Sequence, residues 1–322
     1  MVEPPTSSER QQAALGQAAN AWNQSVHAPI PAAPPTEFDV LGDPQAPIVR
    51  LFAVLDHQGL LTSDGWLRPD IGLISVGDHF DFASDDSASA GMQGVHFLAW
   101  LAAHDPSQVT ILLGNHDVER VMSLGSCTRG EYIEAQQAWR DMLHAKEPLE
   151  RRAWLDRWVA EHPGHPPAVA AHDYRSFVVE QRDLVKRLLL SGRLQLAAVV
   201  DQMDGRPALV THAGISLREH VILGCGLDMD AMVEALNEHL RQAVDQVRVD
   251  WCSGGTRSLD LAPLYHGWTA TRPNGGQLIH RPDLRDAPGH DVRLGLDPPQ
   301  APRSQKPQEF LLFGVDQIVG YD

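Results

Sequence analysis

Four short apolar runs, each ending directly in a cluster of polar residues, constrain the fold of this 322-residue chain more than any other feature. They read EFDVLGD, IGLISVGD, VTILLGN and PALVTHAG, at residues 37–43, 71–78, 109–115 and 207–214. Apolar runs of this length are typical of strands that are buried on both faces of a parallel or mixed sheet. A fifth run with a similar pattern lies at residues 308–322.

Two stretches between these runs, at residues 48–61 and 92–104, carry apolar residues at helical spacing. The alternation of strands and helices predicts an α/β layered fold with right-handed crossovers. In such sheets the chemistry lies beyond the carboxyl ends of the strands. All four polar clusters fall at those ends, so we expect a functional site there.

The domain organisation follows from shifts in composition. Residues 1–36 are polar and Ala/Gln-rich and then Pro-rich, which predicts a flexible N-terminal segment and a linker. Residues 37–322 are expected to form one domain. The Trp-, Arg-, Leu- and Glu-rich stretch at about 125–205 has no strand pattern, and we interpret it as a helical insertion that caps the strand ends.

Composition and charge exclude several classes of partner. The net charge of −16 argues against a duplex nucleic acid or an anionic membrane surface. No apolar run is long enough to span a membrane, and the N-terminus does not have the pattern of a signal peptide. The three cysteines form no CxxC pair, which favours reduced thiols and a cytoplasmic protein.

The polar clusters combine carboxylate, amide and imidazole side chains. A Gly-Asp pair after a strand is common as a cap, whereas GNHD is more specific. Taken together, the clusters resemble those of the calcineurin-like metallophosphoesterases. The THAG segment resembles the branch that contains phosphoprotein phosphatases and bis(nucleosyl)tetraphosphate hydrolases. The matching positions are Asp43, Asp78 with Asp81, Asn115-His116-Asp117, and His212.

The resemblance implies a metallophosphoesterase-like β-sandwich flanked by helices, with a helical cap insertion. It also implies hydrolysis of a phosphate ester by attack of a metal-bound water, at two divalent ions about 3.5–4 Å apart. Oxygen ligands mixed with imidazole suit Mn, Fe or Zn. The implied metal ligands are Asp43 and Gln45 at the first ion, Asp78 as the bridge, and Asn115 and His212 at the second ion.

The remaining roles also follow from the resemblance. His116 would donate a proton to the leaving oxygen, with Asp81 orienting its imidazole. Arg281, or alternatively Arg120, would grip the phosphoryl oxygens. The substrate would be a phosphorylated small molecule, a nucleotide or a phosphoprotein. We interpret His79, together with His96 and His104, as structural or surface residues.

Three positions depart from the family pattern. Gln45 replaces a histidine, so the first ion site is either weaker, with a preference for Mn or Mg, or empty. Phe82 replaces the phosphate-binding arginine of the phosphoprotein phosphatases, and Tyr321 replaces a late histidine. Conceivable substitutes for that histidine are His266, His280 and His290. These departures favour an alternative function, a degenerate member that binds a phosphorylated ligand or partner with little or no turnover.

One further segment, Asp56-His57-Gln58-Gly59, resembles a scrambled first motif. We reject it because it lies inside the amphipathic stretch at residues 48–61 and not at a strand end. Its distance from Asp78 along the chain is also cramped for a helix, a turn and a second strand.

Overall fold

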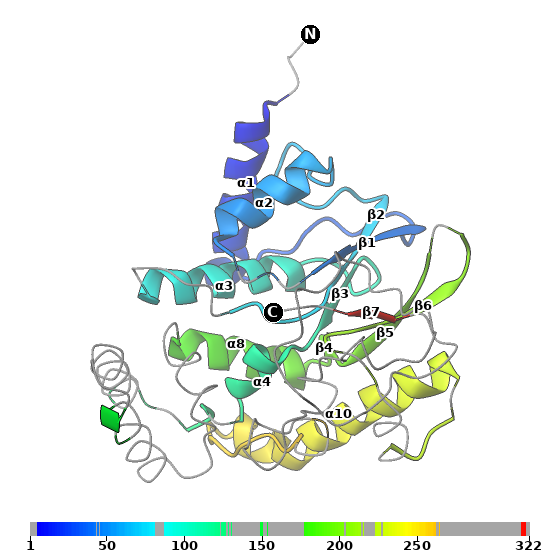
Figure 1. The fold of residues 1–322 in the computed structure, drawn as a ribbon. Coiled ribbons are helices and arrows are strands. Elements are labelled where there is room, and N and C mark those ends of the chain that lie inside the picture. Colours follow the sequence, from blue (N-terminus) through cyan, green and yellow to red (C-terminus); the bar gives the residue numbers. More distant parts are fainter. Residues whose placement is uncertain are drawn as a thin grey trace.

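The computed structural model describes residues 5–42, 44, 46–80, 87–122, 124–126, 128, 130, 149–150, 153, 177–202, 204–213, 215, 223–226, 228–261, 264 and 317–319. The helices and strands of these residues are arranged as in Figure 1. In chain order they are α1 (Ser7–Gln24), β1 (Glu37–Leu41), α2 (Ile48–His57), β2 (Ile71–Ser75), α3 (Ser87–Ala102), β3 (Val109–Leu112), α4 (Asn115–Glu119), α8 (Val179–Leu190), β4 (Leu194–Gln195), β5 (Ala197–Asp201), β6 (Pro207–Thr211), α10 (Met229–Cys252) and β7 (Gln317–Val319).

The strands form two sheets. The first has the order β1-β2-β3-β4, and every neighbouring pair in it is parallel. The second has the order β5-β6-β7, in which β5 is antiparallel to β6 and β6 is parallel to β7. Because the first sheet is parallel, the carboxyl ends of β1, β2 and β3 meet at one edge. The five predicted apolar runs contain β1, β2, β3, β6 and β7, and the predicted α/β class is confirmed.

Alternating side chains of the strands separate the core into layers. Leu73 and Ile111 belong to the large cluster that the helices cover. Ile74 and Leu112, one residue further along each strand, pack with Val210 of β6 in a second apolar cluster between the two sheets. On the outer faces, α3 contacts β3 while α10 contacts β5 and β6 (Figure 1). The result is a layered order of helices, sheet, sheet and helix.

The N-terminal helix α1 differs from the flexible segment that the sequence analysis expected. Ala14 and Ala18 are fully buried, and α1 contacts α2 and α3. Gly65 leaves room for the α1 backbone, because a Cβ on Gly65 would meet the backbone of Ala14. The difference arises because the face that α1 buries consists of alanines, so its sequence has only a weak apolar stripe although this face packs against the core.

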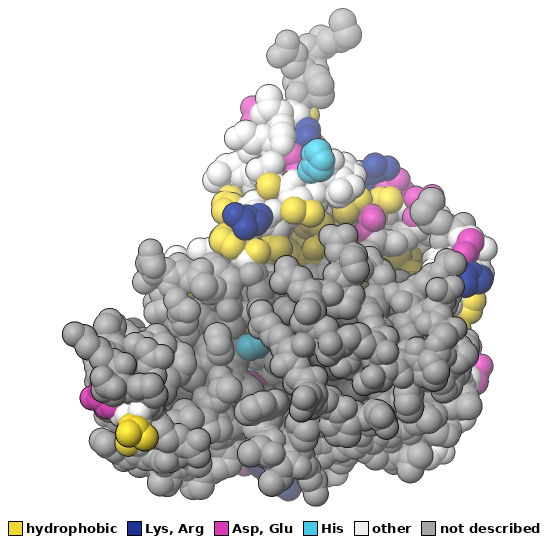
Figure 2. Space-filling model, viewed as in Figure 1, with side chains coloured by type: hydrophobic (Ala, Val, Ile, Leu, Met, Phe, Trp, Pro, Cys, Tyr) yellow, Lys and Arg dark blue, Asp and Glu magenta, His cyan; other side chains and the backbone are white. Residues whose placement is uncertain are grey.

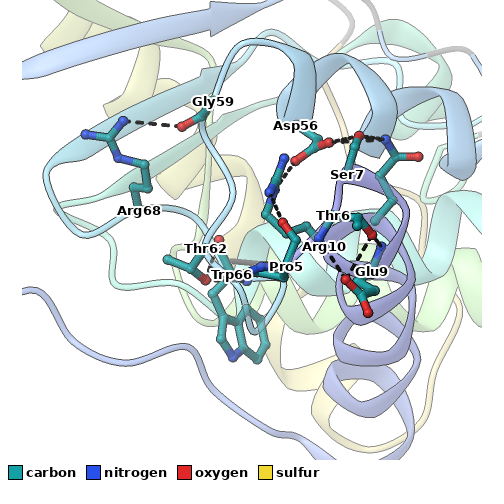
Figure 3. Close-up of polar contacts among 11 residues, drawn as sticks. Pro5, Thr6, Ser7, Glu9, Arg10, Asp56, Gly59, Thr62, Trp66 and Arg68 are labelled. Atoms are coloured by element: carbon teal, nitrogen blue, oxygen red, sulfur yellow. Dashed lines mark hydrogen bonds and ion pairs between the residues drawn. The ribbon is translucent and has the colours of Figure 1, made fainter. Parts of the chain in front are cut away.

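A buried carboxylate on α2, that of Asp56, binds α1 to α2 (Figure 3). Asp56 accepts hydrogen bonds from Ser7 Oγ, from Arg10 Nε at 2.5 Å and from Gln11 Nε2 at 3.3 Å. Asp56 lies within α2 and faces α1, so the rejection of the segment from Asp56 to Gly59 as a metal motif is consistent with its position.

The stretch at about 125–205 also differs from the expected helical insertion where the structure describes it. Helix α8 is present as expected, but β4 extends the first sheet and β5 begins the second. Each of these strands is short, and together they cover only residues 194–201, which explains why the apolar pattern LQLAAVV did not stand out as a strand. Most of the predicted insertion lies outside the described residues.

The surface of the N-terminal half carries apolar side chains. Hydrophobic side chains gather in a band near the N-terminal helices on the face seen in Figure 2. Val49 and Val54 of α2 are exposed large hydrophobic residues. In the part of the chain that the structure describes, no helix has both the length and the apolar character needed to cross a membrane.

Candidate active site at the strand ends

Three of the predicted ligands meet at the carboxyl edge of the first sheet. Asp78 follows β2, Asn115 follows β3, and His212 follows β6 of the second sheet. Their side chains are almost fully buried. Because β2 and β3 are adjacent and parallel, Asp78 and Asn115 leave the sheet at the same edge, and the packing of the second sheet adds His212.

Asp78 occupies an uncommon backbone conformation. Its φ of 57° lies in the left-handed region, which Asp and Asn tolerate better than most residues. Its Oδ1 accepts a hydrogen bond of 2.9 Å from the backbone N–H of His116. A buried carboxylate held in this region at a strand end is the kind of local strain that gathers at functional sites.

The imidazole of His212 is fixed by a backbone carbonyl. Its Nδ1–H donates to Val76 O at 2.8 Å, so in the neutral ring the lone pair is on Nε2. That Nε2 lies 2.9 Å from Asn115 Oδ1 and 3.4 Å from Asp78 Oδ2. Both oxygens are acceptors. With the Asn115 amide as placed, a proton or a metal cation is therefore required to satisfy the contact.

His116 is the most accessible member of the cluster. Its side chain is 13% exposed, compared with 0% for Asp78. Its Nε2 lies 3.9 Å from Asp78 Oδ2, while its backbone N–H is bound to the same carboxylate. This places an imidazole, the side chain best suited to proton transfer near neutral pH, at the rim of the cluster.

The turns that carry these residues are packed against one another. Gly77 has a φ of 99°, and a Cβ there would meet the backbone of Gly114. A Cβ on Gly114 would in turn meet the carboxylate and the backbone nitrogen of Asp78. Both glycines are therefore required by close approach, and Gly77 also by its positive φ.

Asp117 joins the two turns, although the sequence analysis gave it no role. Its carboxylate accepts the backbone N–H groups of Asp78, His79 and Gly114 and the Nδ1–H of His79. Burial by itself would raise the pKa of Asp117, but the His79 imidazole and the N–H donors lower it. The signal for this residue was its place as the last letter of GNHD.

Two of the three histidines interpreted as structural or surface residues are buried and hydrogen-bonded. His79 contacts Asp117 through Nδ1 and lies 2.9 Å from Ser75 Oγ through Nε2. His104 Nδ1 donates to Trp100 O, and its Nε2 accepts the N–H of Leu67. Burial lowers the pKa of His104 to about 4, so this residue is a neutral core histidine.

Arg120, one of the two predicted phosphate-binding residues, is fully buried. Its Nε donates to Gln181 Oε1 at 2.8 Å, and its guanidinium lies 5.2 Å from the centre of the Phe80 ring. Gln181 Nε2 donates to Gly91 O. Arg120 thus connects the end of α4 to α8 and α3.

The other predicted site residues lie outside the described residues. These are Asp43, Gln45, Asp81 and Arg281, and the same holds for Phe82, Tyr321, His266, His280 and His290. Their proposed roles stay predictions. Within the described residues, no group of three or more His, Cys, Asp or Glu side chains is arranged to hold a metal ion. The described part of the cluster supplies Asp78 and His212 together with the amide of Asn115.

Two separations among the described donor atoms are nevertheless compatible with a shared divalent cation. Two ligand atoms bound to one ion at about 2.1 Å lie about 3.0 to 3.4 Å apart when their angle is between the octahedral and tetrahedral values. His212 Nε2 is 2.9 Å from Asn115 Oδ1 and 3.4 Å from Asp78 Oδ2. The Nδ1–H bond to Val76 O is the usual outer contact that prepares a histidine Nε2 as a ligand.

A hollow of about 490 Å³ lies elsewhere, between α1, α3 and α8. Its lining includes Ala21, Ala102, Arg187 and Leu188, and none of the strand-end residues described above. It is therefore not part of the candidate site.

Comparison with known proteins adds no family assignment. No family model matches this sequence, and no curated protein matches it either.

Proposed function

We propose that the chain is a metal-dependent phosphoesterase with a layered fold of the calcineurin-like type. Its substrate would be a phosphorylated small molecule, a nucleotide or a phosphoprotein. One observation carries the proposal. The bond from His212 Nδ1–H to Val76 O leaves Nε2 as the lone-pair atom of the neutral ring. This Nε2 lies 2.9 Å from Asn115 Oδ1 and 3.4 Å from Asp78 Oδ2, separations that two ligands of one cation can have. The order of helices, sheet, sheet and helix around this cluster supports the same assignment.

In this proposal Asp43 and Gln45 would hold one divalent cation and Asn115 and His212 a second, with Asp78 shared by both. Mn, Fe or Zn suits the mixture of oxygen and imidazole donors. When bound, the cations supply positive charge that neutralises a phosphate and acidifies a water molecule. Burial of Asp78 and His212 strengthens their attraction for a cation, because little solvent competes at this position.

His116 is the proposed proton donor to the leaving oxygen. It reaches the rim of the cluster, and its backbone N–H is bound to Asp78 Oδ1, so the backbone of His116 is held beside the proposed cation site. Asp81 would orient this ring. Arg281 is the preferred candidate for gripping the phosphoryl oxygens, because Arg120 is buried and its Nε is bound to Gln181.

The test is hydrolysis of an aryl phosphate by the metal-stripped protein during titration with Mn²⁺. Wild type is expected to show saturable activation. Asp78→Asn keeps a residue that tolerates positive φ but removes the charge. We expect the rate to fall more than about 100-fold, which exceeds the usual effect of changing a residue that only contacts a metal ligand. Circular dichroism and the melting temperature check that this variant folds.

Equal rates for wild type and Asp78→Asn would overturn the assignment. Calorimetric Mn²⁺ binding without hydrolysis at any Mn²⁺ concentration would instead support the alternative from the sequence, a degenerate member that binds a phosphorylated ligand or partner. Gln45, Phe82 and Tyr321 are the positions that favour that alternative.

A further inference from the structure

One buried carboxylate holds the two turns that carry the proposed ligands. Asp117 Oδ2 accepts the N–H of Asp78 at 2.9 Å, the N–H of Gly114 at 3.0 Å and the Nδ1–H of His79 at 3.0 Å. Asp117 Oδ1 accepts the N–H of His79 at 3.0 Å. These donors come from the ends of β2 and β3, so a single side chain connects two strands at the candidate site.

The backbone N–H groups that donate to Asp117 belong to the proposed metal ligands or to their neighbours in the chain. The N–H of Asp78 belongs to a ligand residue itself, and Gly114 directly precedes Asn115. Asp78 is in the left-handed region, and the hydrogen bond to its own N–H helps to hold it there. The close packing of Gly77 on Gly114 leaves both turns little freedom once this carboxylate is in place.

The network continues to Ser75 of β2, which lies 2.9 Å from His79 Nε2. Ser75, His79 and Asp117 thus form a row like that of a serine hydrolase. All three are buried, with exposed fractions of 0%, 2% and 1%. A nucleophile must reach its substrate, so we exclude that role. The row instead supports the orientation of the Asp117 carboxylate.

We propose that Asp117 is a positioning residue of the metal centre, which sets the separation of Asp78 and Asn115 before a cation binds. The inference rests on the proposed function, since it takes these two residues as ligands. Outer contacts of this kind commonly change metal affinity by about 10- to 100-fold. Preorganisation explains such an effect, because a loose site must be ordered when the cation binds.

Asp117→Asn is the variant that tests this role. An amide has one acceptor oxygen and one NH₂ group, whereas the carboxylate accepts at both oxygens. In either orientation the NH₂ group faces at least one N–H donor, so at least one N–H group loses its acceptor and the two turns are held less tightly. We expect Mn²⁺ affinity, measured by titration calorimetry, to fall by about 10- to 100-fold. We also expect faster hydrogen exchange at the amides of Asp78 and Gly114 in the metal-free protein.

Asp56→Asn is the matched control. Asp56 is also a buried carboxylate with several donors, but its donors lie on α1. It is expected to lower stability and to leave both Mn²⁺ affinity and the exchange of the Asp78 and Gly114 amides unchanged. If Asp117→Asn does not fold, His79→Gln replaces it, because this change disturbs only one of the contacts of Asp117, and a several-fold loss of affinity is expected.

Unchanged Mn²⁺ affinity and unchanged amide exchange in Asp117→Asn would overturn the inference. Equal losses of affinity in Asp117→Asn and Asp56→Asn would also overturn it, since general destabilisation would then explain the effect. If the proposed metal site itself does not exist, the result is different, and wild type binds no Mn²⁺. In that case amide exchange at Asp78 and Gly114 still decides whether Asp117 holds the two turns.

Discussion

Two buried aspartates, Asp117 at the strand ends and Asp56 on α2, use the same chemistry for different purposes. Each accepts several hydrogen bonds from a segment distant in the sequence. Three of the donors to Asp117 are backbone N–H groups, whereas the donors to Asp56 are the side chains of Ser7, Arg10 and Gln11. Side chains can turn to water when an acceptor is lost, but backbone groups in a packed turn cannot.

This difference separates two kinds of region. The contacts of Asp117 set the relative positions of residues that we propose as ligands, so a local change there should alter chemistry as well as stability. The contacts of Asp56 attach one helix to the rest of the domain, so a change there should alter stability alone. Two glycines allow the same comparison for the backbone. Gly77 lies in the turn that Asp117 binds, and Gly59 follows the helix that carries Asp56.

The largest difference is expected between Gly77→Ala and Gly59→Ala. Both glycines have positive φ, at 99° and 72°. A Cβ on Gly59 meets nothing within 4 Å, whereas a Cβ on Gly77 would meet the backbone of Gly114. We expect Gly59→Ala to lower the free energy of unfolding by about 1–2 kcal/mol and Gly77→Ala by about 4 kcal/mol or more, measured with urea.

Mn²⁺ affinity sharpens this comparison. Gly77→Ala must displace the turn of Asn115, so its affinity should fall, while Gly59→Ala should bind Mn²⁺ like wild type. Equal effects of the two substitutions on stability and on Mn²⁺ binding would contradict the distinction between the regions.

Asp56→Asn should have an intermediate effect on stability. We expect the free energy of unfolding to fall by about 1–3 kcal/mol, because an amide cannot accept from all three side chains. The loss stays moderate because the side chain of Arg10 is 27% exposed and can turn to water. Urea denaturation measures the change. A larger loss than that of Gly77→Ala would reverse the order proposed here.

The contribution of Asp56 should also depend on pH. Burial raises the pKa of Asp56, but hydrogen bonds from Arg10, Ser7 and Gln11 and the charge of Arg10 lower it below the ordinary 3.8. A depressed pKa stabilises the folded state above the unfolded pKa and loses that effect as pH falls through the folded pKa. The stability difference between wild type and Asp56→Asn should therefore be full at pH 6 and shrink below about pH 4. A difference that grows on acidification would disprove this assignment.

The smallest effect is expected at the start of α1. Thr6 Oγ1 accepts the N–H of Glu9, and the Glu9 carboxylate accepts the N–H of Thr6, which forms a capping box. Thr6→Ala should lower the free energy of unfolding by about 1 kcal/mol or less, because the cap is exposed. The melting temperature should fall slightly while Mn²⁺ affinity stays constant. A change in affinity would show that α1 is coupled to the strand ends.

Much of the fold could be predicted from local patterns. The strands β1, β2, β3, β6 and β7 lie within predicted apolar runs, and α2 and α3 lie within or overlap the predicted helices. By contrast, α1 was expected to be flexible because residues 1–36 are polar and Ala/Gln-rich and then Pro-rich. In the structure its buried face consists of alanines. A helix of this kind gains most of its stability from tertiary packing, which composition does not reveal. The two-residue strand β4 is too short for a periodic pattern.

The sequence predicted which residues belong to the candidate site, but it did not predict which of them contact one another. GD, GNHD and the histidine of THAG were recognised, and the structure brings Asp78, Asn115, His116 and His212 together. Asp117 was part of a recognised motif, yet nothing in the motif indicates that its carboxylate binds the turn after β2. Arg120 was selected as an arginine near GNHD, and its complete burial depends on the packing of Phe80 and Gln181.

The sequence by itself determined where strands end and which polar residues follow them, because apolar runs and glycine-containing turns are local patterns. Only the tertiary structure decided which of those residues meet. His212 and Asn115 are 97 residues apart in the chain, and Asp117 and Asp78 are 39 residues apart. Their contacts depend on parallel pairing of β2 with β3 and on packing of the second sheet against the first. Such long-range packing is a property of the whole fold and not of any short segment.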